Sequence, residues 1–158
     1  LESLTLSKLN LQNYEDLHLN PNNKIKRLDL SLNLLKFIKK NYFSKSNSLK
    51  FLNLSFNMIF HVEINSFLTD NMLLALDLSY NNISNLEMNI FNCEILNLAG
   101  NNLKLFEKSS VITNLNFEAK FKRNQLEEFP GFFYKNKIIM KSIDLSENNI
   151  QILRNLDI

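Results

Sequence analysis

The stretch Ile25-Lys26-Arg27-Leu28-Asp29-Leu30-Ser31-Leu32-Asn33-Leu34-Leu35 recurs, with substitutions, along the whole 158-residue chain. It has apolar residues at its first, fourth, sixth and eleventh positions and asparagine at its ninth. The repeats predict one domain over 1–158, built from about seven units of about 24 residues. The units start near Leu1, Ile25, Leu49, Leu73, Cys93, Asn116 and Met140.

Apolar and variable residues alternate in each unit, as Leu28 and Leu30 do around Asp29. Such alternation is typical of a short strand with one buried face. A single unit is too small to bury its own leucines, so neighbouring units must stack. The sequence therefore predicts a solenoid with a parallel β-sheet along one side.

The ninth position follows each strand, where the turning backbone has no ladder partners. A side-chain amide supplies both a hydrogen-bond donor and an acceptor at such a place. We expect a structural column of six asparagines, one from each repeat that keeps this position: Asn33, Asn57, Asn81, Asn101, Asn124 and Asn148. The chain has 27 asparagines, and we interpret the other 21 as solvent-side residues and turn formers.

This pattern resembles the leucine-rich repeat family, written L-x-x-L-x-L-x-x-N-x-L. Apolar residues, mostly aromatic, recur at position 19: Phe43, Phe67, Phe91, Val111 and Tyr134. Together with a repeat length of about 24 residues, this column resembles the extracellular type found in Toll-like receptor ectodomains and secreted insect immune proteins. The resemblance implies an α/β-type repeat: a curved solenoid with the sheet on its concave face and a mostly irregular or short-helical convex side. We interpret the aromatic column as core packing.

In such a solenoid the variable strand positions form the concave recognition surface. Adjacent strands lie about 4.8 Å apart, so the large side chains at position 8 should stand side by side and form an apolar patch for a partner. The expected contact residues are Leu32, Phe51, Phe56, Met58, Tyr80, Lys120, Lys122 and Arg123. The last three form a basic spot, but Asp144 and Glu147 on the next strand favour charge pairing over phosphate binding.

Two N-x-S sequons begin at Asn53 and Asn82 and are possible glycosylation sites on or beside the same face. The single cysteine, Cys93, occupies a core position and is interpreted as a small buried hydrophobe. Extracellular members of the family usually end in cysteine-bearing caps. We expect this chain to be a fragment lacking both caps, with oligomerisation through the uncapped ends as one consequence.

Other classes of function have little support in the sequence. We expect no enzymatic activity, cofactor or metal site, because the chain has no glycine-rich phosphate loop, nucleophile motif or Cys/His cluster. The net charge of +2 does not indicate nucleic-acid binding. No apolar run approaches the roughly 18 residues of a membrane span.

The resemblance implies a non-catalytic module that binds a protein partner or a pathogen-derived ligand on its concave face. The expected context is an extracellular or cell-surface recognition protein of the innate-immune or receptor type. The alternative is a cytoplasmic repeat scaffold or regulatory subunit of an enzyme. The missing caps and the single cysteine, Cys93, favour that alternative, whereas the aromatic column and the length of the units oppose it.

Overall fold

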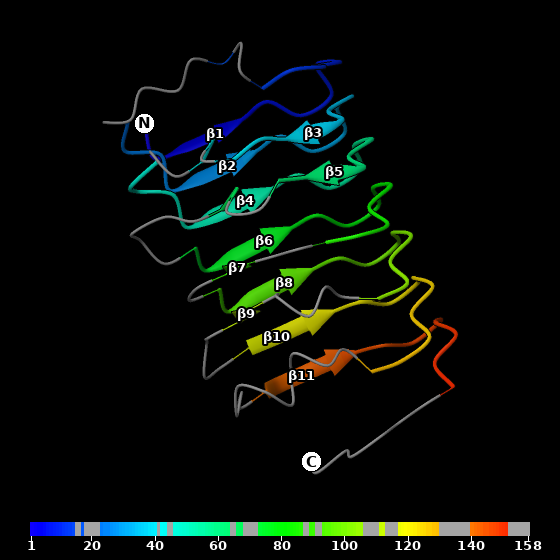
Figure 1. Cartoon of the computed structure of the whole chain (residues 1–158). Helices are drawn as coiled ribbons and strands as arrows, with labels where there is room; N and C mark the ends of the chain where they lie inside the picture. The colour runs from blue at the N-terminus through cyan, green and yellow to red at the C-terminus, as the bar shows by residue number, and fades with distance from the viewer. Residues whose placement is uncertain are drawn as a thin grey trace.

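The computed structural model describes residues 1–14, 17, 23–40, 42–43, 46–63, 66–67, 73–86, 89–90, 93–105, 111–112, 117–129 and 140–151. Seven strands form one parallel sheet in chain order (Figure 1). They are β1 (Ser3–Thr5), β2 (Arg27–Asp29), β4 (Phe51–Asn53), β6 (Ala75–Asp77), β8 (Ile95–Asn97), β10 (Phe117–Lys120) and β11 (Met140–Asp144). Two small parallel sheets pair β3 (Phe37–Ile38) with β5 (His61–Val62) and β7 (Asn89–Ile90) with β9 (Val111–Ile112).

The register of the large sheet follows the sequence repeat. The third residues of the predicted units pair across the sheet as Ser3, Arg27, Phe51, Ala75, Ile95, Glu118 and Ser142. Each of these residues therefore lies one repeat after its partner, and the shortened fourth unit between Ala75 and Ile95 keeps the same pairing. Each turn of the chain returns to the neighbouring strand. The prediction of a stacked, parallel-strand repeat solenoid is confirmed.

The interior is a continuous stack of aliphatic side chains. Leu28 and Leu30 are 2% and 0% exposed, and the equivalent leucines of the next three turns are buried as deeply. In the sixth unit the fully buried Phe117 pairs with Met140, and the register shifts by one residue after it. The predicted start of that unit, Asn116, lies outside the described residues.

Aromatic rings fill the other side of the interior. Phe43 and Phe67 are buried and stack with ring centroids 6.0 Å apart and an interplanar angle of 9°. Tyr14 is also buried and lies 5.7 Å from Phe43. These contacts are core packing. Phe91, Tyr134 and the side chain of Val111 lie outside the described residues.

The ninth-position asparagines link each turn to the one before it. Asn81 donates to the carbonyls of Leu54 and Leu78, both at 3.0 Å, and accepts the N–H of Ile59 at 2.9 Å. The same three kinds of bond recur at each of the others, which are Asn33, Asn57, Asn101, Asn124 and Asn148. The amides thereby satisfy backbone groups that the strand ladders leave unpaired.

The return segments consist of short strands and turns where the structure describes them. They carry the pairs β3–β5 and β7–β9, and no α-helix occurs among the described residues. The helical element of the predicted α/β type is therefore not found there. β-branched and aromatic residues such as Ile38, Val62 and Phe37 favour this extended conformation. Within the same residues, no helix has the length and apolar character needed to cross a membrane.

Candidate binding surface

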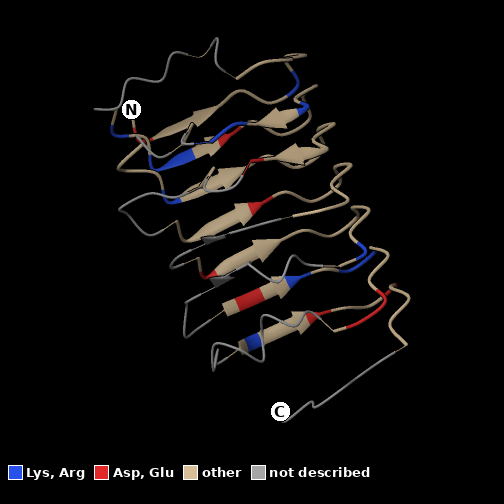
Figure 2. Cartoon of the chain, in the orientation of Figure 1, with Lys and Arg blue, Asp and Glu red and all other residues tan. Residues whose placement is uncertain are grey.

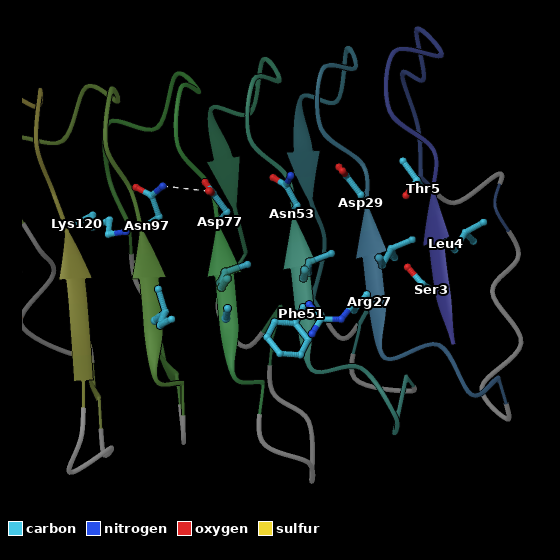
Figure 3. Close-up of a pocket in the computed structure, with 15 residues that line it drawn as sticks. Ser3, Leu4, Thr5, Arg27, Asp29, Phe51, Asn53, Asp77, Asn97 and Lys120 are labelled. Carbon is cyan, nitrogen blue, oxygen red and sulfur yellow. Dashed lines mark hydrogen bonds between the residues drawn. The ribbon is translucent and has the colours of Figure 1, made fainter. Parts of the chain in front are cut away.

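The outer face of the large sheet carries the third and fifth residue of each unit. Because side chains alternate along a strand, Arg27 and Asp29 point outward while Leu28 between them is buried. A shallow hollow of about 400 Å³ runs across this face from β1 to β10 (Figure 3). Its outward lining residues are Ser3, Thr5, Arg27, Asp29, Phe51, Asn53, Ala75, Asp77, Ile95, Asn97 and Lys120.

Phe51, predicted as an open contact residue, is partly covered within the hollow. The guanidinium carbon of Arg27 lies 3.8 Å from the centroid of the Phe51 ring (Figure 3). The Phe51 side chain is half-buried, with Arg27 over its ring. The pair is a cation–π contact, so this part of the hollow presents a charged group to a ligand as well as an aromatic ring.

The fifth-position side chains are fixed by turns at the ends of their strands. Asp29, Asn53, Asp77, Asn97 and Asp144 each accept the backbone N–H two residues on, at 2.9 to 3.1 Å. The hydroxyls of Ser55, Ser79 and Ser146 donate to the same oxygens. Bonds from the hydroxyl and N–H of Ser146 hold the pKa of Asp144 below its usual value. Asn97 also donates to Asp77 at 3.0 Å, so the polar row of the hollow is ordered before any ligand binds.

The eighth residue of every unit lies in the left-handed backbone region. The φ angles are 58° for Lys8, 54° for Leu32, 53° for Phe56, 53° for Tyr80, 67° for Gly100, 57° for Arg123 and 56° for Glu147. This conformation costs an L-residue roughly 1–2 kcal/mol. Six of the seven positions nevertheless hold a residue with a side chain. Among the described residues, Asn10, with a φ of 57°, is the one residue outside this row that adopts the same conformation.

Phe56 and Tyr80 form the centre of this row. Their rings stack with centroids 4.4 Å apart and an interplanar angle of 12°. The Tyr80 ring extends over Gly100, where an added Cβ would lie 2.7 Å from a ring carbon. The absence of a side chain at Gly100 is what allows the Tyr80 ring to lie over the fifth turn.

Apolar side chains continue beyond the strands in the second and third turns. Met58 and Phe60 follow Phe56 at alternate positions and face outward, and Phe37 meets Phe60 edge-to-face at 4.9 Å. We define the edge patch as six residues that are 41% to 49% exposed: Leu32, Phe37, Phe56, Met58, Phe60 and Tyr80. Sequence reasoning missed Phe37 and Phe60 because they lie past the repeat motif. The alternation Phe56, Met58, Phe60 was the available signal.

The basic spot of the sixth turn is matched by carboxylates. Lys120 lies 3.4 Å from Glu118, and Lys122 lies 3.0 Å from Glu147, which also pairs with Arg123. Hydrogen bonds from Arg123 and then Lys122 lower the pKa of Glu147. All three cations are therefore engaged by carboxylates on their own or the next strand.

The two sequons differ in their surroundings. The amide oxygen of Asn53 accepts the N–H and the hydroxyl of Ser55 inside the hollow, and its side chain is half-buried. Asn82 is exposed beside Tyr80. The geometry therefore leaves Asn82 the more accessible of the two asparagines.

Groups capable of chemistry are sparse in the described part of the chain. Cys93 is fully buried, and this burial raises the pKa of its thiol to about 12. Among the described residues, no group of three His, Cys, Asp or Glu side chains could hold a metal ion. His61 is exposed at the start of β5, and His18 lies outside the described residues.

No protein-family model matches the chain, and no curated protein matches it.

Proposed function

We propose that this chain is a leucine-rich repeat module that binds a protein or pathogen-derived ligand and performs no catalysis. The outer face of the sheet, with its hollow, would be the concave face of a curved solenoid. Support comes from the motif, from strands that pair one repeat apart, and from asparagines that bond successive turns. The buried Phe43–Phe67 stack agrees with the extracellular type.

The observation that carries the proposal is the exposed, stacked pair Phe56 and Tyr80. Interface hot spots are enriched in aromatic residues, and rigid groups lose little entropy on binding. The ring stack and the left-handed backbone fix both side chains in the unbound chain. A preorganised apolar pair at the margin of a polar hollow is suited to recognition and has no evident role in the core.

The contact set under this proposal is the one expected from the repeat: Leu32, Phe51, Phe56, Met58, Tyr80, Lys120, Lys122 and Arg123. The exposed rings and Met58 would supply apolar contact, while the hollow would bind polar groups of the ligand. Arg27 joins the set because it covers Phe51. The location would be extracellular or at the cell surface, with Asn82 as the preferred glycosylation site.

Affinity capture with two variants tests the binding proposal. The chain and the double variant Phe56→Glu/Tyr80→Glu are immobilised, and captured proteins are quantified by mass spectrometry. Leu9→Glu is the matched control, because Leu9 is 54% exposed and lies outside the edge patch. The proposal expects ligands that the control retains and the double variant loses. Identical capture by all three would refute the assigned surface.

Secretion is tested separately in cells that express the intact gene product. A mobility shift that an N-glycosidase removes and that Asn82→Gln abolishes would place the chain outside the cytoplasm. Retention in the cytoplasm with bound enzyme subunits would instead favour a repeat scaffold or regulatory subunit, and would overturn the extracellular assignment.

A further inference from the structure

The edge patch extends the candidate surface beyond the sheet. Its six residues come from three consecutive turns, whereas the hollow is lined by the third and fifth strand positions. Four other large apolar residues are exposed among those described, namely Leu1, Leu9, Ile95 and Leu105. None of these four belongs to the second or third turn. The apolar surface is therefore concentrated on the edge beside β3 and β5.

Backbone hydrogen bonds and ring contacts hold the edge patch in place. Phe56 N–H donates to Ser79 at 3.0 Å, Met58 N–H to Leu35 at 3.0 Å, and Phe60 N–H to Lys36 at 3.1 Å. The two aromatic pairs, Phe56–Tyr80 and Phe37–Phe60, each join residues of neighbouring turns. A fixed apolar surface of this kind fits a partner with a defined shape of its own.

The dimensions of the edge patch match one helix. Three turns spaced by about 4.8 Å span roughly 10 Å across the stack, which is close to the diameter of an α-helix with its side chains, about 10–12 Å. From Phe56, which lies at a bend with a φ of 53°, to Phe60 the chain advances four residues, which span less than the roughly 13 Å of a fully extended strand. That limit corresponds to about two turns of an α-helix, whose pitch is about 5.4 Å.

Lysines border the edge patch. Lys36 directly precedes Phe37, and Lys39 and Lys40 follow Ile38. Figure 2 shows these basic segments at both ends of β3. Among the described residues of 34–43 and 58–63, Glu63 is the only carboxylate, and it accepts the backbone N–H of Lys40 at 2.7 Å. The local formal balance is three lysines against one glutamate, which favours an acidic partner.

We infer that the edge patch binds a single amphipathic α-helix of a protein partner. The helix is apolar along one face, with residues at i, i+3 or i+4, and i+7, and it carries acidic residues toward the lysines around β3. This inference rests on the proposed binding function and names the class of partner for its edge. Phe56 and Phe60 anchor the apolar face, while Lys36 and Lys40 select for negative charge.

Selection from a displayed library of random peptides, each long enough for about four helical turns, tests the inference with the chain as the target. The expected winners have apolar residues at helical spacing, a negative net charge, and helical circular dichroism when bound. Phe60→Glu should weaken their binding by about tenfold or more, as for an interface hot spot. Lys36→Glu/Lys40→Glu should weaken it several-fold and reduce its dependence on salt.

Leu105→Glu is the matched control, because Leu105 occupies in the fifth unit the position that Phe37 has in the second and is 47% exposed. Its affinity for the selected peptides should equal that of the unmodified chain. Phe60, Lys36, Lys40 and Leu105 are exposed, so these variants should keep the circular dichroism spectrum of the parent.

Several results would overturn the helix inference. One is selection of no peptides, or of peptides that lack helical spacing or are basic. Peptides lost on Asp77→Lys but not on Phe60→Glu would place binding in the hollow, and the proposed function would survive without the inference. Sedimentation of the chain with phosphatidylserine vesicles would identify a membrane as the occupant of the edge patch if Phe60→Glu abolished that binding. A dimer in analytical ultracentrifugation would identify a second copy of the chain if Phe60→Glu abolished the dimer.

Discussion

Replacing Asn81 by alanine is expected to lower the free energy of unfolding by about 3 kcal/mol. Asn81 is 5% exposed and makes bonds to Leu54, Leu78 and Ile59. Alanine removes these three bonds and supplies no replacement. It also removes a longer bond to the Ser79 carbonyl at 3.2 Å, but that carbonyl keeps the N–H of Phe56 as a donor. The three backbone groups differ in whether they keep another hydrogen-bond partner, and this difference sets the expected loss of stability.

The two carbonyls keep a second donor. Leu54 still accepts from Asn57 and Leu78 still accepts from Asn101, each at 3.0 Å. Losing one of two donors at each carbonyl costs about 0.5 kcal/mol, at the low end for a hydrogen bond. The N–H of Ile59 has no other acceptor in the described structure. A buried, unpaired donor costs about 2 kcal/mol, which brings the sum to about 3 kcal/mol.

Urea unfolding followed by far-UV circular dichroism measures this loss, because the chain contains no tryptophan and the free energy is extrapolated linearly. Asn82→Ala is the matched control: the neighbouring residue is exposed, and its loss should change stability by less than about 0.5 kcal/mol. Asn148→Ala should cost about 1 kcal/mol, because water can reach its partly buried partners.

An Asn81→Ala variant as stable as Asn82→Ala would refute the structural role of the column. Equal losses at Asn81 and Asn148 would show that burial does not set the magnitude.

Three further predictions concern single residues. Gly100→Ala should destabilise the chain by about 1–2 kcal/mol, because φ is +67° and an added Cβ would lie against the Tyr80 ring. In urea unfolding, the loss should be smaller when Tyr80 is already alanine. Additive losses in the double mutant would contradict the contact between Gly100 and Tyr80. Because burial raises the pKa of Cys93 to about 12, its thiol should react with an aromatic disulfide reagent at pH 8 only on unfolding, so prompt labelling of the native chain would contradict its burial. The pKa of Glu147 is lowered from 4.5, so its contribution is present above pH 4.5 and is lost as the pH falls through the folded-state pKa. The stability difference between the chain and Glu147→Gln should therefore narrow below pH 4.5 in urea titrations, and a difference independent of pH would show that the pairs with Arg123 and Lys122 are not formed in solution.

The strand side of the solenoid is predictable because its determinants are local. Alternation alone assigns Leu28 and Leu30 to the interior, and both are buried. The constant repeat then identifies which strand neighbours which, since Arg27 and Phe51 occupy the same place in successive units. The alternation within a strand and the spacing of the repeats are therefore sufficient to predict the buried face and the order of the strands, and composition adds little.

The return side is less predictable, because the motif ends before it begins. Among the described residues, helix is limited to a 3₁₀ assignment at Leu17. Phe37-Ile38 and His61-Val62 instead pair as strands. Each two-residue segment is too short for a reliable assignment from propensity. Their pairing depends on the turns being stacked already, which is tertiary information.

The candidate surface divides in the same way. The exposure of Leu32, Phe56 and Tyr80 follows from their common position in the repeat. The contact between Arg27 and Phe51 depends on rotamers that the repeat does not specify. The position of the Tyr80 ring depends on the absence of a side chain at Gly100, the equivalent residue of the next unit. Such contacts between variable positions require coordinates.

The asparagine bonds have a consequence for how such a chain changes length. Asn57, Asn81 and Asn101 each engage the same three backbone groups, two carbonyls and one N–H, whatever side chains those residues carry. These backbone bonds can therefore form between any two neighbouring turns that keep the asparagine. Duplication or loss of one whole unit by unequal recombination would preserve the interior while shifting the order of residues along the edge patch. The asparagine bonds thus do not depend on how many units the gene encodes, whereas the order of exposed residues along the edge patch does.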